Sequence, residues 1–308
     1  MNKIVSSGSM DYKHQKQMTD ADIAFYHENG FFAVENGLST DQINALCDDT
    51  VSICRGKYGK ISGIDEFPDE TLSDHEVIKK FLCIHFPHKG SKLMYEYLAQ
   101  EAIKEVLTSV IGPDVKCMQS MLFMKASGKP GQAWHQDELY IPTRDRTLIG
   151  AWMALDDATI ENGCLWVIPG SHKPGVLWPQ EFTTNPEFDC SGESKFPYGD
   201  DEAIPLEVKA GTILFFNGYL LHRSLKNRAP EGTFRRVLVN HYMSASSLLP
   251  WKFKEETPFA TLDFRDIVMI AGSDPYVYKG TEDVTAMHLR STGEGGCGDG
   301  SKKSLEGN

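Results

Sequence analysis

The stretch from about residue 113 to residue 245 constrains the fold of this chain more than any other. Apolar runs of strand length follow one another there, separated by Gly, Pro and Asn, with no helical period between them. The runs cover residues 115–125, 148–155, 164–168, 206–208, 212–216 and 234–243. Short strands at this spacing predict a β-sandwich or a barrel.

The part of the chain before these strands carries helix signals. Thr19 and Ser39 each begin a capping box, which predicts one short helix ending near residue 30 and a second helix after Ser39. Residues 91–110 have a helical pattern with a possible break near residue 100. Residues 31–34 and 79–86 are predicted to be extended.

These signals fit one domain with an all-β core and helical additions. The mass of 34.4 kDa for 308 residues is large for a lone barrel and small for two full-size domains. We expect a disordered leader over 1–17 and a disordered Gly- and Ser-rich tail over 291–308. Between them, the single domain of residues 18–290 would have a helical part (about 18–112), a barrel (about 113–245) and a C-terminal extension (about 246–290).

Composition narrows the classes of partner. A net charge of −12 argues against nucleic acid or an anionic membrane and leaves a small molecule as the expected partner. The 7 cysteines are scattered and never form Cys-x-x-Cys, which indicates free thiols in a reducing compartment. No apolar run is long enough for a signal peptide or a membrane span, so we predict a cytoplasmic protein. The oligomeric state stays open.

The segment 131–138 is the first candidate for chemistry because it contains His135 and Asp137. Two residues apart on an extended segment, their side chains point to the same face. An imidazole and a carboxylate held there can bind one divalent metal, and a distant second His would complete the two-His-one-carboxylate triad of non-haem Fe(II) oxygenases. On spacing alone, a surface His beside a solvated Asp is the more common arrangement, and the surrounding motifs have to decide between the two interpretations.

Further motifs follow downstream. The pair Asn162-Gly163 favours a tight hairpin turn before the next predicted strand. His222 comes after the strand 212–216, and Arg235 and Arg236 lie on the strand after that. A His and then an Arg in this order suit a third metal ligand and a bidentate partner for a carboxylate.

Together these motifs resemble the phytanoyl-CoA dioxygenase family. The matching residues are Met121, His135-Gln136-Asp137, Gly150-Ala151-Trp152, Glu161-Asn162-Gly163-Cys164-Leu165, Pro169-Gly170-Ser171-His172, His222 and Phe234-Arg235. The similarity extends from about Thr19 to about Tyr242. It implies a double-stranded β-helix, a jelly-roll or cupin-like barrel flanked by N-terminal helices. It also implies a dioxygenase that uses Fe(II), 2-oxoglutarate and O2 to hydroxylate a small-molecule substrate, with release of succinate and CO2.

The resemblance implies roles for individual residues. His135, Asp137 and His222 would be the iron ligands. Arg235 would bind the distal carboxylate of 2-oxoglutarate. The rest of that pocket would be lined by Met121, Gln136 and Trp152.

The choice between Arg235 and Arg236 is open, because the gap from His222 is longer than usual for the family. Alternation along the strand favours Arg235, which shares a face with Val237 and Val239. A lysine that family members carry before the first barrel strand could match Lys79 or Lys80. Desaturation or ring formation stays possible as the reaction outcome.

Several alternatives remain at this point. The insertion 173–205 is either a lid over the site or a packed surface segment. His85, His88 and His241 are more typical of core or surface histidines than of ligands. The chain could also be a metal-binding β-barrel with hydrolase or isomerase activity, or a non-catalytic ligand-binding barrel. Arg235 separates these alternatives from the oxygenase, because neither a hydrolase or isomerase nor a non-catalytic barrel needs an arginine there to bind the carboxylate of 2-oxoglutarate.

Overall fold

The computed structural model describes residues 8–189, 192–248, 267–279, 281 and 285–291. Two β-sheets make up its centre. The larger sheet runs in the order β1-β2-β11-β6-β13-β4-β3-β15, with β14 paired to β4, and the smaller sheet in the order β10-β7-β12-β5. The strands are β1 (Ser9–Asp11), β2 (Phe31–Glu35), β3 (Phe81–His85), β4 (Val115–Ala126), β5 (Gln132–His135), β6 (Ile149–Ala154), β7 (Leu165–Val167), β10 (Ile204–Leu206), β11 (Ile213–Asn217), β12 (His222–Ser224), β13 (Phe234–Ser244), β14 (Val268–Ala271) and β15 (His288–Ser291).

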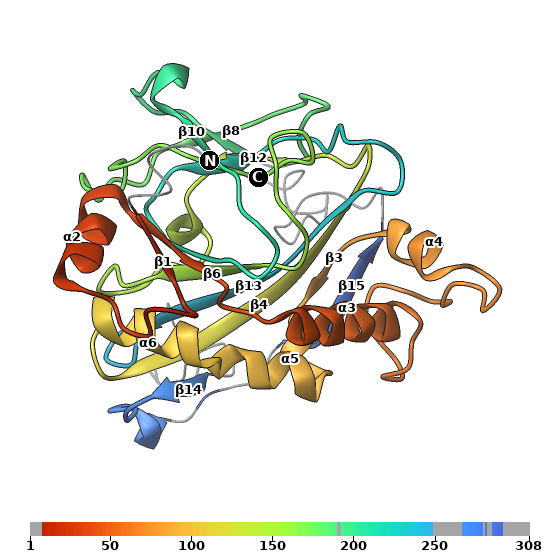
Figure 1. Cartoon of the computed structure of the whole chain (residues 1–308), viewed down its shortest axis with the longest axis horizontal. Helices are drawn as coiled ribbons and strands as arrows, with labels where there is room; N and C mark the ends of the chain where they lie inside the picture. Colours follow the sequence, from red (N-terminus) through yellow and green to blue (C-terminus); the bar gives the residue numbers. More distant parts are fainter. Residues whose placement is uncertain (1–7, 190–191, 249–266, 280, 282–284, 292–308) are drawn as a thin grey trace, which may run out of the picture.

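Helices cover the outer face of the larger sheet. They are α2 (Asp20–Asn29), α3 (Thr40–Cys54), α4 (Asp74–Lys79), α5 (Lys92–Glu96) and α6 (Glu101–Val110), with short 3-10 turns at Pro87–Lys89, Tyr97–Ala99, Asp137–Leu139, Asp200–Glu202 and Val277–Lys279. In Figure 1, α3, α5 and α6 lie below the long strands β4 and β13, and β10 and β12 of the smaller sheet lie above them. This arrangement confirms the predicted jelly-roll barrel with N-terminal helices.

The local signals act as predicted. The side chains of Thr19 and Ser39 each accept a hydrogen bond from the backbone N–H of the third helical residue. The side chain of that third residue, Asp22 or Gln42, accepts a hydrogen bond from the backbone N–H of Thr19 or Ser39 in turn. The first helix ends at Gly30, whose φ of 81° lies in the left-handed region that glycine adopts without strain. The break expected near residue 100 is also present, because Gln100 caps the start of α6.

Alternation along the strands of the larger sheet divides its side chains between two cores. Phe32 and Leu238 pack with the helices, beside Leu46 of α3. Their neighbours Phe31 and Val237 face the interior between the two sheets. Because a one-residue shift would exchange these two sets, burial on both faces fixes the register of the larger sheet.

Two predictions about the chain need correction. Ser9–Asp11 pairs in parallel with β2, so the expected disordered leader does not reach residue 17. Asn162-Gly163 does not form a hairpin, because β6 before it belongs to the larger sheet and β7 after it to the smaller one. The turn is tight, with Gly163 at φ 84°, but it carries the chain from one sheet to the other. The expected tail beyond residue 291 and residues 249–266 of the extension lie outside the described residues.

The described part of the insertion 173–205 packs against the outer face of the smaller sheet. It contains the hairpin of β8 (Gln180–Phe182) and β9 (Gly192–Ser194). Trp178, Phe196 and Tyr198 form a cluster with Trp134 of β5. This packing favours the interpretation of a packed surface segment, and motion on substrate binding stays a prediction.

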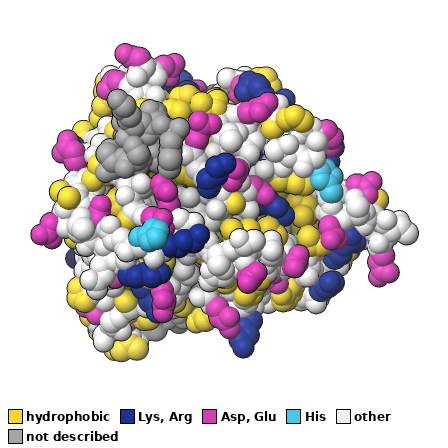
Figure 2. Space-filling model, in the orientation of Figure 1, with side chains coloured by type: hydrophobic (Ala, Val, Ile, Leu, Met, Phe, Trp, Pro, Cys, Tyr) yellow, Lys and Arg dark blue, Asp and Glu magenta, His cyan; other side chains and the backbone are white. Residues whose placement is uncertain are grey.

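The surface and the helices bear on the expected partners. On the face seen in Figure 2, acidic and basic side chains are interspersed rather than gathered into one basic surface. None of the helices in the described part of the chain has the length and apolar character needed to cross a membrane.

Candidate metal centre

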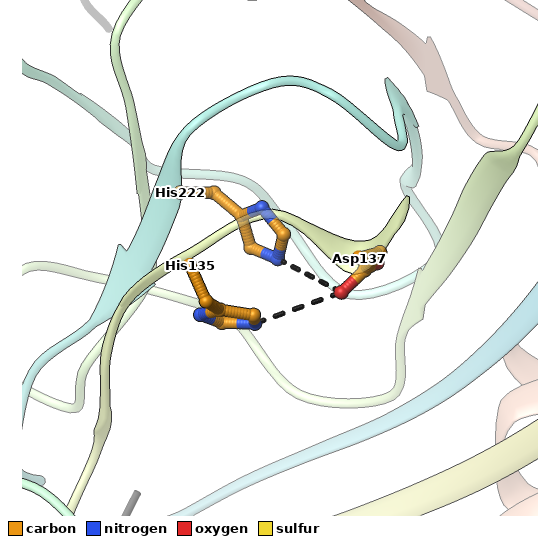
Figure 3. A group of neighbouring side chains, drawn as sticks. All are labelled: His135, Asp137 and His222. Carbon is orange, nitrogen blue, oxygen red and sulfur yellow. Dashed lines mark ion pairs between the residues drawn. The ribbon is translucent and has the colours of Figure 1, made fainter. Parts of the chain in front are cut away.

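His135 and His222 are brought together by strand pairing. They are the last residue of β5 and the first residue of β12, and the antiparallel register sets them directly opposite each other. Their ring centroids are 4.1 Å apart. Asp137 follows His135 after one extended residue and begins a 3-10 turn, so its carboxylate reaches the same point (Figure 3).

The three side chains offer one ligand atom each to a common point. Asp137 Oδ1 is 3.6 Å from His135 Nε2 and 3.6 Å from His222 Nε2. Atoms that each bind one ion at roughly 2.1 Å lie about 3 to 4 Å apart, so this spacing suits a shared metal. The set of two imidazoles and one carboxylate is the one that non-haem Fe(II) prefers.

The backbone selects the histidine tautomer that a metal needs. His135 Nδ1 lies 2.7 Å from the carbonyl oxygen of Ala133, and His222 Nδ1 lies 2.9 Å from that of Leu220. A carbonyl oxygen can only accept, so each Nδ1 carries the proton and donates it. Both Nε2 atoms are then left with a lone pair directed at the centre.

Charges in the centre favour metal binding. Burial, and to a smaller extent the neighbouring His222, lower the pKa of His135 to about 4, so His135 is neutral at pH 7. Burial alone would raise the pKa of Asp137, but His222, His241 and His135 together bring it below its usual value. The carboxylate is therefore ionised beside a neutral imidazole, as coordination requires.

His241 is part of the centre, which the sequence did not predict. Its Nε2 lies 2.8 Å from Asp137 Oδ2 and donates to it, which leaves Oδ1 for a metal. Strand alternation could have predicted this position, because His241 lies six residues after Arg235 on the same strand and therefore faces the same side of the sheet.

Arg235 lies inside the barrel behind the metal centre. Its side chain is 4% exposed, and its guanidinium lies over the ring of Trp152, 5.5 Å from the centroid. Arg236 points the other way and forms a two-pronged pair with Asp156, with N–O distances of 2.9 and 2.7 Å. Of the two arginines, Arg235 is therefore the one directed at the interior.

The other predicted pocket residues have different surroundings. Met121 and Trp152 are buried on the inner face, on either side of Val239 in the register of the sheet. Gln136 is buried as well, but its amide donates to the carbonyl oxygens of Val176 and Tyr219 and accepts from the N–H of Trp178. These bonds use both N–H groups of Gln136, so it ties the insertion to the barrel and has no donor left for a ligand.

A lysine lines the cavity that contains Arg235, but it is neither Lys79 nor Lys80. Lys79 lies at the surface and pairs with Glu231, and Lys80 is exposed. Lys125 of β4 lines the cavity beside Arg235, and its Nζ donates to Ser224 Oγ at 2.9 Å. Strand alternation could have found both residues, since Lys125 shares a face with Met121 and Ser224 shares one with His222.

The fold and this centre define a class, the non-haem iron oxygenases built on a jelly-roll barrel. The family model described as phytanoyl-CoA dioxygenase matches residues 26–237, and the chain belongs to this family. It is accordingly an Fe(II)- and 2-oxoglutarate-dependent oxygenase, as its sequence predicts.

Individual relatives agree with this assignment. The chain is 31% identical over 233 residues to the peroxisomal phytanoyl-CoA dioxygenase of Homo sapiens, covering 72% of this chain and 67% of the relative. It is 28% identical over 242 residues to phytanoyl-CoA dioxygenase 1 of Oryza sativa subsp. japonica, covering 69% and 85%.

Solved structures show the same fold. The apo form of the non-haem monooxygenase ThoJ superposes with a TM-score of 0.62 at 18% identity, covering 85% of this chain and 87% of that one. EvdO2 from Micromonospora carbonacea var. aurantiaca, complexed with 2-oxoglutarate, gives a TM-score of 0.56 at 16% identity, covering 78% and 96%.

Proposed function

We propose that His135, Asp137 and His222 bind the iron and that the enzyme hydroxylates a small organic molecule. The observation that carries this proposal is the convergence of two Nε2 lone pairs and one carboxylate oxygen on a single point. A facial triad leaves three metal positions open, enough for a bidentate co-substrate and O2. When bound, iron and 2-oxoglutarate supply the activation of O2 that oxidises a C–H bond of the substrate, with succinate and CO2 released.

Asp137 bears on the type of oxidation. Its carboxylate is held on one side by His241 and offers its other oxygen to the metal position. Related halogenases have a small residue at this position so that chloride can bind. The carboxylate therefore supports hydroxylation over halogenation, with desaturation or ring formation as the other outcomes of a product analysis.

Arg235 is the proposed anchor of the co-substrate. A buried guanidinium binds a carboxylate through two parallel hydrogen bonds, and burial strengthens the pair. Arg235 lines a cavity together with Phe123, Ser224 and Gln132, and Gln132 lies on the same strand as His135. This arrangement supports 2-oxoglutarate binding with one end at the metal and the other at Arg235. A metal-binding hydrolase or a non-catalytic barrel has no use for such an anchor.

The experiment separates ligand loss from unfolding. His135→Ala and His222→Ala should abolish turnover and weaken anaerobic Fe(II) binding at least 100-fold, with an unchanged far-ultraviolet circular dichroism spectrum. His172→Ala is the control, because its Nε2 contacts the backbone of His27 outside the centre. Full activity in either ligand variant would rule out the assignment.

The substrate is best approached without a preferred candidate. A pool of metabolites should be screened for compounds that stimulate succinate formation, with phytanoyl-CoA as one arm because the relatives carry that name. Nucleic acid should give no stimulation, as the net charge predicts. The cytoplasmic location also stays a prediction, and imaging of a fluorescent fusion in cells tests it against the peroxisome named for the human relative.

A further inference from the structure

One row of side chains crosses the inner face of the larger sheet, from the metal centre to the edge of the sheet. Val239 of β13 is paired with Met121 of β4, and Met121 with His85 of β3. His85 is paired in turn with His288 of β15, and β3 and β15 form this edge of the sheet (Figure 1). His241 of the metal centre lies two residues after Val239 and faces the same side. The row therefore leads from the metal centre to a pair of histidines.

This row is separate from the anchor cavity, which is the cavity lined by Arg235. Arg235 lies four residues before Val239 on β13, about 13 Å away along an extended strand. Met121, His85 and His288 do not line that cavity. A molecule bound at the two histidines therefore reaches the metal centre along the row without entering the space proposed for the distal carboxylate of 2-oxoglutarate.

The edge is covered in the next row and open at the histidines. Cys83 and Arg290 are cross-strand partners there, 0% and 3% exposed, and Arg290 pairs with Asp189 of the insertion. His85 and His288 are only half-buried. The inner face is therefore accessible from the edge at the row that leads to the metal centre.

The backbone is strained directly after His85. Phe86 has φ 52° and ψ 46°, in the left-handed region that is unfavourable for a bulky side chain. It also precedes Pro87, a position that favours extended backbone. Strain of this kind is found chiefly at functional sites, and here it ends β3 with His85 as the last residue of the strand.

Each of the two histidines uses one ring nitrogen on a neighbour. His85 Nε2 lies 3.3 Å from Cys83 Sγ, and His288 Nδ1 lies 3.2 Å from Ser62 Oγ. The ring centroids of His85 and His288 are 5.8 Å apart. Within the described part of the chain, the other nitrogen of each ring has no hydrogen-bond partner. Two neighbouring imidazoles thus each have a nitrogen free for a ligand.

The surroundings favour a ligand that accepts hydrogen bonds. A thiol and a hydroxyl can donate to the bound nitrogens, which leaves the proton on His85 Nδ1 and on His288 Nε2. Burial, and to a smaller extent the basic side chains of His288 and Arg290, lower the pKa of His85 to about 4. A basic neighbourhood of this kind attracts a negative charge.

We propose that His85 and His288 bind a carboxylate or phosphate group of the organic substrate, whose reacting carbon lies beyond Met121 at the metal centre. This proposal rests on the proposed function and names the substrate class. Neighbouring strands are about 4.8 Å apart, so the charged group lies roughly 10 Å from the carbon that is oxidised. If the two rings only bond water, the site has no preference for an anion.

The experiment compares three probes of similar length, which are pentanoate, butyl phosphate and the neutral pentan-1-ol. The enzyme is loaded anaerobically with Fe(II) and saturating 2-oxoglutarate, and calorimetry gives the dissociation constant of each probe. His85→Leu and His288→Leu remove the ring nitrogens, whereas His85→Asn and His288→Gln keep a donor near the free nitrogen. His14→Leu is the matched control, because the side chain of His14 is 82% exposed on the turn after β1.

We expect the wild type and His14→Leu to bind pentanoate or butyl phosphate about 10- to 100-fold more tightly than pentan-1-ol. The tighter anion identifies the group. Each leucine variant should lower this preference at least about 5-fold, and the Asn and Gln variants should recover part of it. The two positions are tested separately, so a variant that does not fold leaves the other informative.

Equal affinity of the wild type for all three probes would overturn the inference. An unchanged preference in a folded leucine variant would overturn the role of that histidine. The visible absorbance band of the chelate of Fe(II) and 2-oxoglutarate is recorded in every sample. A normal band without any anion preference would overturn this inference alone, whereas a wild-type enzyme without the band would overturn the proposed function and this inference with it.

Discussion

His241 donates a hydrogen bond from Nε2 to Asp137 Oδ2 across 2.8 Å, from the strand β13 that also carries Arg235. The donor fixes the carboxylate so that Oδ1, and not Oδ2, faces His135 and His222. One strand thus orients a proposed metal ligand with His241 and supplies the proposed carboxylate anchor with Arg235. The strand β13 therefore contributes a residue to each end of the proposed co-substrate site.

Removal of this hydrogen bond should weaken the metal site. Partners that orient a metal ligand typically contribute 10- to 100-fold in affinity. We expect His241→Phe, which keeps a ring of similar size, to raise the dissociation constant of Fe(II) by about that factor in anaerobic calorimetry. His172→Phe should leave Fe(II) affinity unchanged, because His172 contacts the carbonyl oxygen of His27 instead. Equal Fe(II) affinity in His241→Phe and wild type would contradict the orienting role.

The two adjacent arginines should separate co-substrate binding from stability. Arg235→Ala removes a buried charged contact of roughly 2–4 kcal/mol, so the KM for 2-oxoglutarate should rise about 30- to 1000-fold. Arg236→Ala should leave that KM within a few-fold. It should instead lower the free energy of unfolding by about 1–3 kcal/mol, because Asp156 loses a two-pronged partner. Steady-state kinetics and urea unfolding test the pair, and reversed effects would move the anchor to Arg236.

Local rules predicted most of the fold and part of the site. Capping boxes at Thr19 and Ser39 predicted both helix starts, because caps depend on a few neighbouring residues. The Asn162-Gly163 turn was misassigned because turn chemistry fixes the bend and not the sheet in which the next strand pairs. That pairing depends on contacts distant in the sequence.

The same distinction explains which site residues the sequence missed. His135 and Asp137 form a recognisable local pattern, whereas Lys125 and His241 become meaningful only when β4 and β13 are seen as partners in one sheet. Gln136 illustrates the opposite case. It lies between two proposed ligands in the sequence, but alternation turns its amide toward the insertion, where it bonds Val176.

Glu138 should make stability depend on pH. Burial raises its pKa to about 7, against the hydrogen bonds from Thr143 that lower it. A carboxyl group whose pKa is higher in the folded state than in the unfolded state stabilises the fold most while it is protonated in both states, below the unfolded pKa of about 4.5. That contribution to stability is lost as the pH rises through the folded pKa of about 7. Glu138→Gln cannot ionise, so it should gain on the order of 2–3 kcal/mol relative to wild type between pH 4 and pH 8. Urea midpoints at the two pH values measure this gain.

The control for this effect is Glu70→Gln, at an exposed position, which should follow the wild type at both pH values. If the difference between Glu138→Gln and wild type is the same at pH 4 and pH 8, then Glu138 is not held in its neutral form by burial.

Arg290 and Asp189 should couple the last described strand to the insertion. Arg290 of β15 is buried and binds Asp189 through two hydrogen bonds of 2.6 and 3.0 Å. The backbone N–H of Asp189 also donates to the carbonyl oxygen of Gly131, just before β5. Arg290 and Asp189 both line the anchor cavity, so their pair closes a wall of the proposed co-substrate site.

A double-mutant cycle tests this coupling. Asp189→Asn leaves a buried guanidinium without its carboxylate and should cost about 3–5 kcal/mol of unfolding free energy, whereas Arg290→Met should cost less, because Asp189 is nearer the surface. The double variant should be more stable than the sum of the two losses predicts, by at least about 1 kcal/mol. Both single variants should also bind 2-oxoglutarate several-fold more weakly, since the insertion would no longer be held against the cavity. Additive losses in unfolding, with unchanged 2-oxoglutarate affinity, would mean that the pair neither couples these segments nor supports the site.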